Sequence, residues 1–353
     1  MAILILTASF GTASAENPAN EAKITQGFFA GAANQTKDFQ KIAVLFPQAM
    51  GMIYLLGVQD NVAGLSIAKL NISMHDGGFY KSVDPKAASK LDIGFPGKVN
   101  METIVSINPD LLIEPSFQLK VEEHIKKLEC STYKLYGTFS NVGQWLDAVL
   151  KTGELLNKKE TAKKYFNYFN EKINFTKSRI AKNPPVKPIK VLHLTKAGDK
   201  IFTHGRKSSF AKDMLKMCGC DVFGYSEISV MEQTISMEDV LKFDPEIIIC
   251  EEINHAASRQ SIELKGGFWS KLRAFKENKI YSVPVDDETC FLTNWYFNVA
   301  SPLGLLWTAK TIYPETFKDV DLDKEAQFFY GEFFKIDVMN MRSSNKNIEK
   351  KRK

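Results

Sequence analysis

The chain has 353 residues, of which 44% are hydrophobic and 25% are charged, so it is long enough for two globular domains, each with its own core. Its formal net charge of +5 is mild, and part of that charge belongs to the basic segment 345–353. This balance, with no dense basic face and no nucleic-acid-binding motif, argues against a nucleic-acid-binding protein.

The N-terminus reads MAILILTASFGTASAEN, an apolar run that ends in Ala13-Ser14-Ala15. A small-residue site of this kind is typical of the end of a secretory signal peptide. The positively charged region that normally precedes the apolar run is missing, because the first basic residue is Lys23. We therefore expect residues 1–15 to be a signal peptide whose positively charged first region is truncated, and residues 16–37 to be an N-terminal extension. A signal peptide predicts export to the periplasm. The alternative is an apolar N-terminal helix or strand. No Cys lies near the cleavage site, which argues against a lipid anchor.

Short apolar runs alternate with amphipathic segments between residues 38 and 143. Strands are expected at 41–46, 61–66, 110–115 and 132–137, and helices at 48–57, 101–107, 119–128 and 142–156. Strands that alternate with helices predict a parallel sheet covered on both faces, so this region is expected to form an N-terminal α/β lobe.

The segment 144–187 is expected to link the two lobes, and its second half is predicted to form one long helix. Ala162, Tyr165, Phe169, Ile173 and other apolar residues recur every three or four positions over more than 20 residues, until Pro184 and Pro185 end the pattern. Such a stiff connection predicts that two lobes are joined by one long helix and move little relative to each other.

The region 188–335 repeats the strand–helix alternation and is expected to form a C-terminal α/β lobe. Strands are expected at 190–194, 200–205 and 246–250, helices at 208–219 and 237–243, a helix followed by a strand at 269–285, and a closing helix at 299–314. The residues 336–353 are expected to form a basic flexible tail.

One unit appears twice in the chain, at an offset of 136 residues. VNMETIVSINPDLLIEP (99–115) aligns with ISMEDVLKFDPEIIICEE (235–252), so that Glu102 meets Glu238 and Pro109 meets Pro245. A helix, a proline, an acid and an apolar strand are a common way to build a βα unit, so coincidental similarity is one explanation. The fold does not require glutamate at matched positions, however, and two exposed carboxylates at equivalent points suit a partner with twofold symmetry.

This layout resembles the substrate-binding proteins of bacterial ABC importers for iron–siderophores, haem and vitamin B12. The resemblance covers roughly residues 38–335 and rests on the two repeated segments and the linking helix. It implies two α/β lobes whose parallel sheets face a ligand cleft and are joined by one long α-helix. It also implies that Glu102 and Glu238 dock onto basic residues of a permease dimer. The absence of catalytic motifs and the scattered histidines predict that the protein is not an enzyme. The segment 300–334 resembles the closing part of a subgroup linked to metal chelates and oxyanions.

Ligands of open α/β sheets bind beyond the carboxyl ends of the strands, which predicts where the cleft residues lie. Arg206 is the most suggestive of them, because it follows an expected strand in FTHGRKSSF and precedes a helix start that favours anions. A solvated basic loop is an equal alternative for this stretch. The candidate ligand-binding residues are Gln48, Lys69, His75, Phe117, His204, Arg206, Trp295 and Tyr296. An aromatic pair such as Trp295 and Tyr296 is more often part of a core.

Other histidines and the cysteines carry weaker signals. His193 lies in an apolar stretch and is expected in the core, and His124 on a charged helix face is expected to be solvated. Cys130, Cys218, Cys220, Cys250 and Cys290 make an odd number, and we expect most to be buried apolar side chains, with a Cys250–Cys290 disulfide left open. No P-loop, nucleophile elbow or HExxH motif is present.

The sequence thus predicts a monomeric periplasmic binding protein that delivers an iron(III)–siderophore to an ABC importer, with no intrinsic cofactor. A nickel or cobalt chelate, haem or an oxyanion such as molybdate are alternatives within the class. A bare zinc- or manganese-binding protein, using His75, His204, His255 and Glu252, is a further alternative, as is a two-lobed enzyme.

Overall fold

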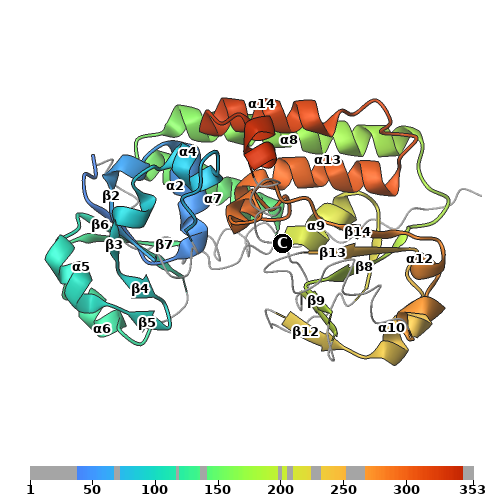
Figure 1. Cartoon of the computed structure of the whole chain (residues 1–353), viewed down its shortest axis with the longest axis horizontal. Helices are drawn as coiled ribbons and strands as arrows, with labels where there is room; N and C mark the ends of the chain where they lie inside the picture. Colours follow the sequence, from blue (N-terminus) through green and yellow to red (C-terminus); the bar gives the residue numbers. More distant parts are fainter. Residues whose placement is uncertain are drawn as a thin grey trace, which may run out of the picture.

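The computed structural model describes residues 38–66, 72–116, 119–135, 141–197, 201–204, 210–223, 232–251 and 267–344. It has two α/β lobes side by side, and the long helices α8, α13 and α14 run along one side of both (Figure 1). The predicted signal peptide and N-terminal extension lie outside the described residues. Within the described residues, no helix is long and apolar enough to cross a membrane.

The N-terminal lobe is built on a five-stranded parallel sheet of order β3-β2-β1-β6-β7. Its strands are β1 (Ile42–Val44), β2 (Val62–Leu65), β3 (Leu91–Asp92), β6 (Leu111–Pro115) and β7 (Ser131–Leu135). Alternate side chains of the central strands enter different clusters, with Val44 and Ile113 on one face and Ala43 and Leu112 on the other. Both faces are therefore covered, which explains the continuous apolar runs in the sequence.

The helices of this lobe follow its strands. They are α2 (Pro47–Leu56), α4 (Phe79–Val83), α5 (Met101–Ile107), α6 (Glu122–Ile125) and α7 (Val142–Leu155), with 3-10 turns η1 (Gln59–Asn61) and η2 (Ala87–Ser89) and a small hairpin of β4 (Gly94–Phe95) and β5 (Lys98–Val99). The helix α6 is shorter than the predicted span 119–128, in which only Leu119 and Ile125 are buried apolar residues.

The C-terminal lobe has a four-stranded parallel sheet of order β11-β8-β13-β14. Its strands are β8 (Lys190–Leu194), β11 (Asp221–Val222), β13 (Ile247–Cys250) and β14 (Ile280–Ser282). A separate antiparallel sheet joins β9 (Lys196–Ala197), β10 (Ile201–His204) and β12 (Glu232–Ile235). The helices are α9 (Phe210–Met217), α10 (Met237–Phe243) and α12 (Arg273–Lys276), with turns η3 (Trp269–Lys271), η4 (Phe291–Thr293) and η5 (Asn298–Ala300).

The helix α8 (Lys159–Lys182) confirms the predicted linking helix. Its 24 residues give a length of about 36 Å at 1.5 Å per residue. The predicted stripe is its inner face, since Ala162, Tyr165, Phe169 and Ile173 are buried in a cluster that also contains residues of both lobes. The helices α13 (Ser301–Ile312) and α14 (Leu322–Phe334) contribute to the same cluster, so one core extends from lobe to lobe.

Tyr165 links α8 to its neighbours by two buried hydrogen bonds. Its hydroxyl accepts a hydrogen bond from Trp145 Nε1 of α7 at 3.0 Å and donates one to the carbonyl of Val299 at 2.9 Å. Both partners are buried, so neither could turn to water if the hydroxyl were removed.

The predicted flexible tail at 336–353 is wrong for its first part. Residues 338–344 are helical, and Ile336, Val338 and Met341 are buried. Arg342 donates from Nε to Asp286 Oδ1 at 2.7 Å, and Asp286 is itself buried. The basic residue thus neutralises a buried carboxylate, whereas the sequence suggested only a solvated charge; residues 345–353 lie outside the described part.

The Tyr165 hydroxyl gives a test of the contact between α8 and its neighbours. Tyr165→Phe would remove both buried hydrogen bonds, and should lower the free energy of unfolding by about 1–3 kcal/mol. Tyr168→Phe is the matched control on the same helix, because its hydroxyl bonds to the partly exposed Glu325 at 2.8 Å. Denaturant unfolding should show the larger loss for Tyr165→Phe; equal losses would contradict the role of the buried bonds.

Candidate functional site

Buried polar side chains gather at the carboxyl ends of the parallel strands in both lobes. Ser66 follows β2, and Thr195 and Glu251 follow β8 and β13. Among the described residues, the hydroxyls of Ser66 and Thr195 have no hydrogen-bond partner. The carboxyl ends of these parallel strands lie at one edge of each sheet. This is the edge at which open α/β sheets bind ligands.

His193 and Glu251 form a buried pair in the C-terminal lobe. Nε2 of His193 lies 3.1 Å from Oε2 of Glu251, and the ring of Tyr296 lies against the imidazole with centroids 5.6 Å apart. The prediction that His193 is a core histidine is confirmed, since it is fully buried. Its acidic partner was not foreseen, because the two residues are far apart in sequence and meet only through the pairing of β8 with β13.

His75 connects the N-terminal lobe to the segment after β14. Its Nε2 lies 3.4 Å from Asp287 Oδ1 and 3.1 Å from Thr289 Oγ1. The other oxygen of Asp287 accepts a hydrogen bond of 2.8 Å from the backbone N–H of Phe79, at the start of α4. His75 is therefore held by a buried carboxylate, and its predicted ligand contact stays a prediction.

Lys212 is a buried cation that the sequence reasoning did not single out. It lies in the first turn of α9 and is completely buried, and this burial lowers the pKa of its amine to about 8. Burial likewise raises the pKa of Glu114, the buried carboxyl near the end of β6. Neither residue is distinguished by a sequence motif, and only the fold reveals that they are shielded from water.

The remaining predicted ligand residues have different outcomes. Trp295 and Tyr296 are buried in the core, with Trp295 Nε1 donating to Asp286 at 2.5 Å and the Tyr296 hydroxyl bonded to Thr308 at 2.7 Å. That burial does not support direct ligand contact and favours the core alternative. The predicted residues Lys69, Phe117 and Arg206, and the side chains of Gln48 and His204, lie outside the described part of the chain.

The two repeated units adopt matching structures. Each helix has seven residues and a side-chain N-cap, with Asn100 accepting from Thr103 N–H and Ser236 accepting from Asp239 N–H. Each ends in a non-glycine residue with positive φ, Asn108 or Asp244. The equivalence predicted from sequence therefore extends to the backbone.

The acids after the two prolines have a structural role. Asp110 accepts hydrogen bonds from the N–H groups of Gln40 and Lys41, just before β1. Glu246 lies 3.4 Å from the N–H of Lys190 at the start of β8. This part of the repeat is explained by the βα unit itself.

Glu102 and Glu238 have no such role. Both are exposed, and neither side chain has a hydrogen bond or ion pair with any residue that the structure describes. Figure 1 places their helices, α5 and α10, in different lobes and on the side of the molecule away from α8. Their positions are compatible with docking, which remains a prediction.

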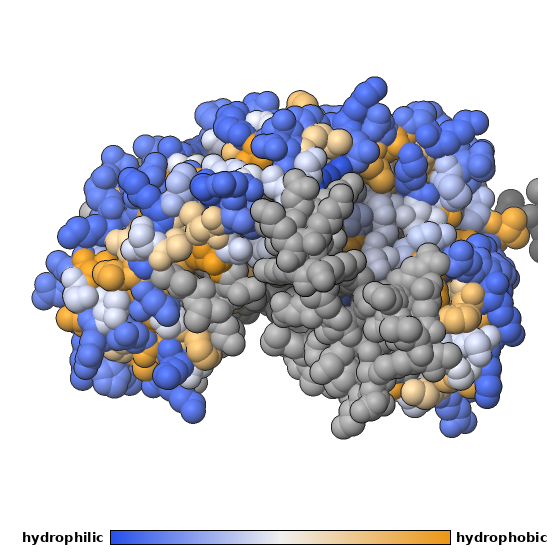
Figure 2. Space-filling view, viewed as in Figure 1, coloured by the Kyte–Doolittle hydropathy of each residue, from blue (hydrophilic) through white to orange (hydrophobic). Residues whose placement is uncertain are grey.

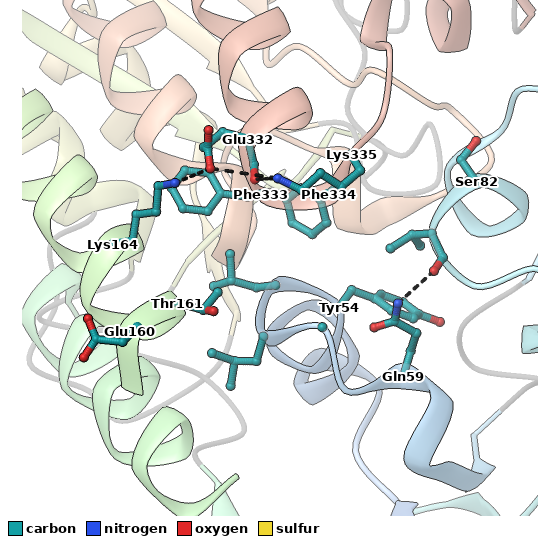
Figure 3. A pocket seen from close by; sticks show the side chains of 14 residues that line it. Tyr54, Gln59, Ser82, Glu160, Thr161, Lys164, Glu332, Phe333, Phe334 and Lys335 are labelled. Carbon is teal, nitrogen blue, oxygen red and sulfur yellow. Dashed lines mark hydrogen bonds and ion pairs between the residues drawn. The ribbon is translucent and has the colours of Figure 1, made fainter. Parts of the chain in front are cut away.

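A pocket of about 580 Å³ lies elsewhere, among α2, α8 and α14. Figure 3 shows Tyr54 and Gln59 on one side of it, and Thr161, Lys164 and Glu332 on the other. None of the predicted site residues lines this pocket, and it is formed by helices rather than by strand ends. It is therefore distinct from the site at the strand ends.

All five cysteines lie in the described residues. Four are buried, namely Cys218, Cys220, Cys250 and Cys290, as predicted for most of them. The Cys250–Cys290 disulfide is not formed.

A sequence model of the family described as "Periplasmic binding protein" matches residues 42–286. Among curated relatives, the putative ABC transporter substrate-binding lipoprotein YhfQ of Bacillus subtilis is 25% identical over 79% of this chain and 86% of its own. The Fe(3+)-citrate-binding protein YfmC of the same organism is 25% identical over 67% of this chain and 73% of its own. The molybdate-binding protein MolA of Haemophilus influenzae is 30% identical, but only over 29% of this chain and 27% of its own.

Solved structures share the fold over most of the chain. A periplasmic solute-binding protein from Veillonella parvula has a TM-score of 0.71 at 22% identity, covering 91% of this chain and 99% of its own. MolA of Haemophilus influenzae bound to molybdate gives 0.69 at 18% identity, covering 86% and 95%. CeuE of Helicobacter pylori with Ni(II) bound gives 0.67 at 21% identity, covering 87% and 94%.

The buried Lys212 gives a pH-dependent test. Its amine has a pKa of about 8 when folded against an ordinary value of 10.5, so between these values the unfolded chain binds more protons. Rising pH over that window should therefore stabilise the wild type relative to Lys212→Met, which has no group to titrate there. Urea unfolding of both proteins from pH 7 to 10.5 checks this. A difference in unfolding free energy that stays constant across the window would contradict the burial of a titrating amine.

Proposed function

Because the chain belongs to the periplasmic binding protein family, we propose that it captures an iron(III)–siderophore and delivers it to the permease dimer of an ABC importer. The chain is an ABC transporter substrate-binding protein of this class, and its relatives are transport proteins rather than enzymes. Its ligand, its docking residues and its export to the periplasm are proposed in addition.

The observation that carries the proposal is the placement of buried polar groups at the carboxyl ends of the strands in both lobes. Ser66 from the N-terminal lobe and Thr195 from the C-terminal lobe have hydroxyls that a ligand between the lobes could satisfy. Such groups suit an oxygen-rich chelate. The basic stretch FTHGRKSSF favours an anionic ligand, and the name of the relative YfmC records ferric citrate.

Other ligands of the same class are supported by specific neighbours. CeuE was solved with Ni(II) and MolA with molybdate, so a nickel or cobalt chelate and an oxyanion are alternatives, as is haem. A bare zinc or manganese ion would need three or four protein ligands. In the described ranges no three His, Cys, Asp or Glu side chains are grouped to hold a metal.

Native mass spectrometry of the protein isolated from its own cells tests the ligand. We expect a bound mass equal to a ferric siderophore, and loss of that mass together with iron when the sample is treated with a strong iron chelator. A bound mass equal to molybdate, a nickel complex or haem would contradict the ferric siderophore as ligand and leave the substrate-binding function unchanged. A metal ion retained without any organic ligand or oxyanion would contradict chelate capture.

The docking role of the repeated glutamates gives a second test. Glu102→Arg and Glu238→Arg should each reduce ligand uptake by cells, and the double variant should reduce it most, because each reversal places like charges together in the docked complex. Neither change should alter the ligand Kd, since both side chains are exposed and neither is expected to touch the ligand.

The control for these variants is Glu160→Arg, a reversal on α8 beside the pocket of Figure 3 and outside the repeat. It should leave uptake unchanged. Full uptake by the double reversal, or a ligand Kd that shifts with either single change, would exclude Glu102 and Glu238 as docking residues.

A further inference from the structure

We propose that each docking point combines a carboxylate with an apolar side chain: Glu102 with Val105 on α5, and Glu238 with Leu241 on α10. The partner, an integral-membrane permease with twofold symmetry, would then present an apolar socket beside each of its cations. This inference rests on the proposed function and adds the chemistry of the partner's surface.

The pairing follows from helix geometry and from the repeat. Val105 lies three residues after Glu102 and Leu241 three residues after Glu238, a spacing that places side chains next to each other on one helix face. Val105 and Leu241 are themselves related by the offset of 136 residues. The match therefore includes an apolar residue beside each acid as well as the acid itself.

Neither apolar side chain belongs to a buried core cluster. Val105 is 60% exposed and Leu241 is 37% exposed, whereas their inward neighbours Ile104 and Val240 are fully buried and hold each helix on its sheet. Ile107 of α5 also packs closely against β2. A Cβ added at Gly64 of β2 would lie only 2.5 Å from Cδ1 of Ile107, so only glycine leaves room for this side chain.

Val105 and Leu241 are among the few large hydrophobic residues that are exposed in the described ranges. Only seven large hydrophobic residues there are exposed, and three of them, Val105, Met237 and Leu241, lie on α5 and α10. Figure 2 shows hydrophobic side chains among hydrophilic ones at the end of the molecule where α5 lies. Single exposed apolar residues are ordinary, but these two occupy matched positions of the two lobes.

The accompanying charge identifies a protein partner with cations. A second copy of this chain would set Glu102 or Glu238 against the same acids, which is unfavourable. An anionic lipid surface would repel them as well. A cationic residue flanked by an apolar socket, present once per permease subunit, complements both halves of each pair.

The two halves should act on different steps of docking. Charges at the rim of an interface accelerate association and make it sensitive to salt, whereas buried apolar contacts slow dissociation. The apolar residues should therefore determine how long the complex lasts.

The test measures binding of the purified protein to the importer complex of the same cells, reconstituted in nanodiscs, by biolayer interferometry. Val105→Gln and Leu241→Gln remove the apolar surface while keeping good helix propensity, and Val186→Gln changes an exposed apolar residue outside the repeat. Each docking variant should dissociate about tenfold faster with unchanged association, as expected for losing a buried apolar side chain. Thermal unfolding should be unchanged in all three variants, and Val186→Gln should bind as the wild type does.

The outcomes separate this inference from the function on which it rests. If Val105→Gln and Leu241→Gln dissociate as slowly as the wild type, while Glu102→Gln and Glu238→Gln associate more slowly, the apolar sockets are overturned and the docking acids are left in place. Normal association by the Glu variants would overturn the docking function itself. Equal binding to nanodiscs without the importer would show a lipid surface instead and would overturn the proposed partner.

Discussion

Tyr165 and its apolar neighbours on α8 are buried against helices of both lobes, and this contact determines where the two sheets lie relative to each other. The stripe enters a cluster that contains Val44 and Ile113 of one sheet and Val191 and Ile249 of the other. A hinge of flexible residues would separate the two cores, but a shared core resists separation because moving either lobe would expose apolar surface. The positions of the strand ends and of α5 and α10 all follow from this one helix.

The proposed docking by the two repeated units depends on a fixed arrangement of the lobes. Two equivalent docking points can engage a twofold-symmetric partner together only if their separation is nearly constant. The structure assigns the repeat's residues to different tasks: Asp110 and Glu246 hold the starts of strands, Ile104 and Val240 hold the helices, and Glu102 and Glu238 are left at the surface. The proposed docking onto a permease would explain why this last pair is alike.

The two lobes and the helix that joins them could be predicted because their signals are local, whereas α14 and the antiparallel sheet of β9, β10 and β12 were not predicted. The stripe on α8, the apolar runs of β6 and β13 and the capped helices α5 and α10 can each be read within one segment. The site was less accessible, because its groups meet only through long-range pairing. His193 meets Glu251 across two strands, and His75 meets Asp287 across more than half of the chain. Lys212 differs from other lysines only in its burial, which the sequence does not reveal. Arg342 was misjudged for the same reason, since its partner Asp286 is distant in sequence.

The distance between α5 and α10 tests the central claim of a stiff, two-point docking protein most directly. Spin labels at Ser106→Cys and Lys242→Cys, in a Cys130→Ser background, would report it by pulsed electron resonance, since both positions are exposed and the other cysteines are buried. The account predicts one narrow distance distribution that shifts little when the ligand binds. A broad distribution in the free protein, or a large shortening on binding, would show a flexible hinge and contradict it.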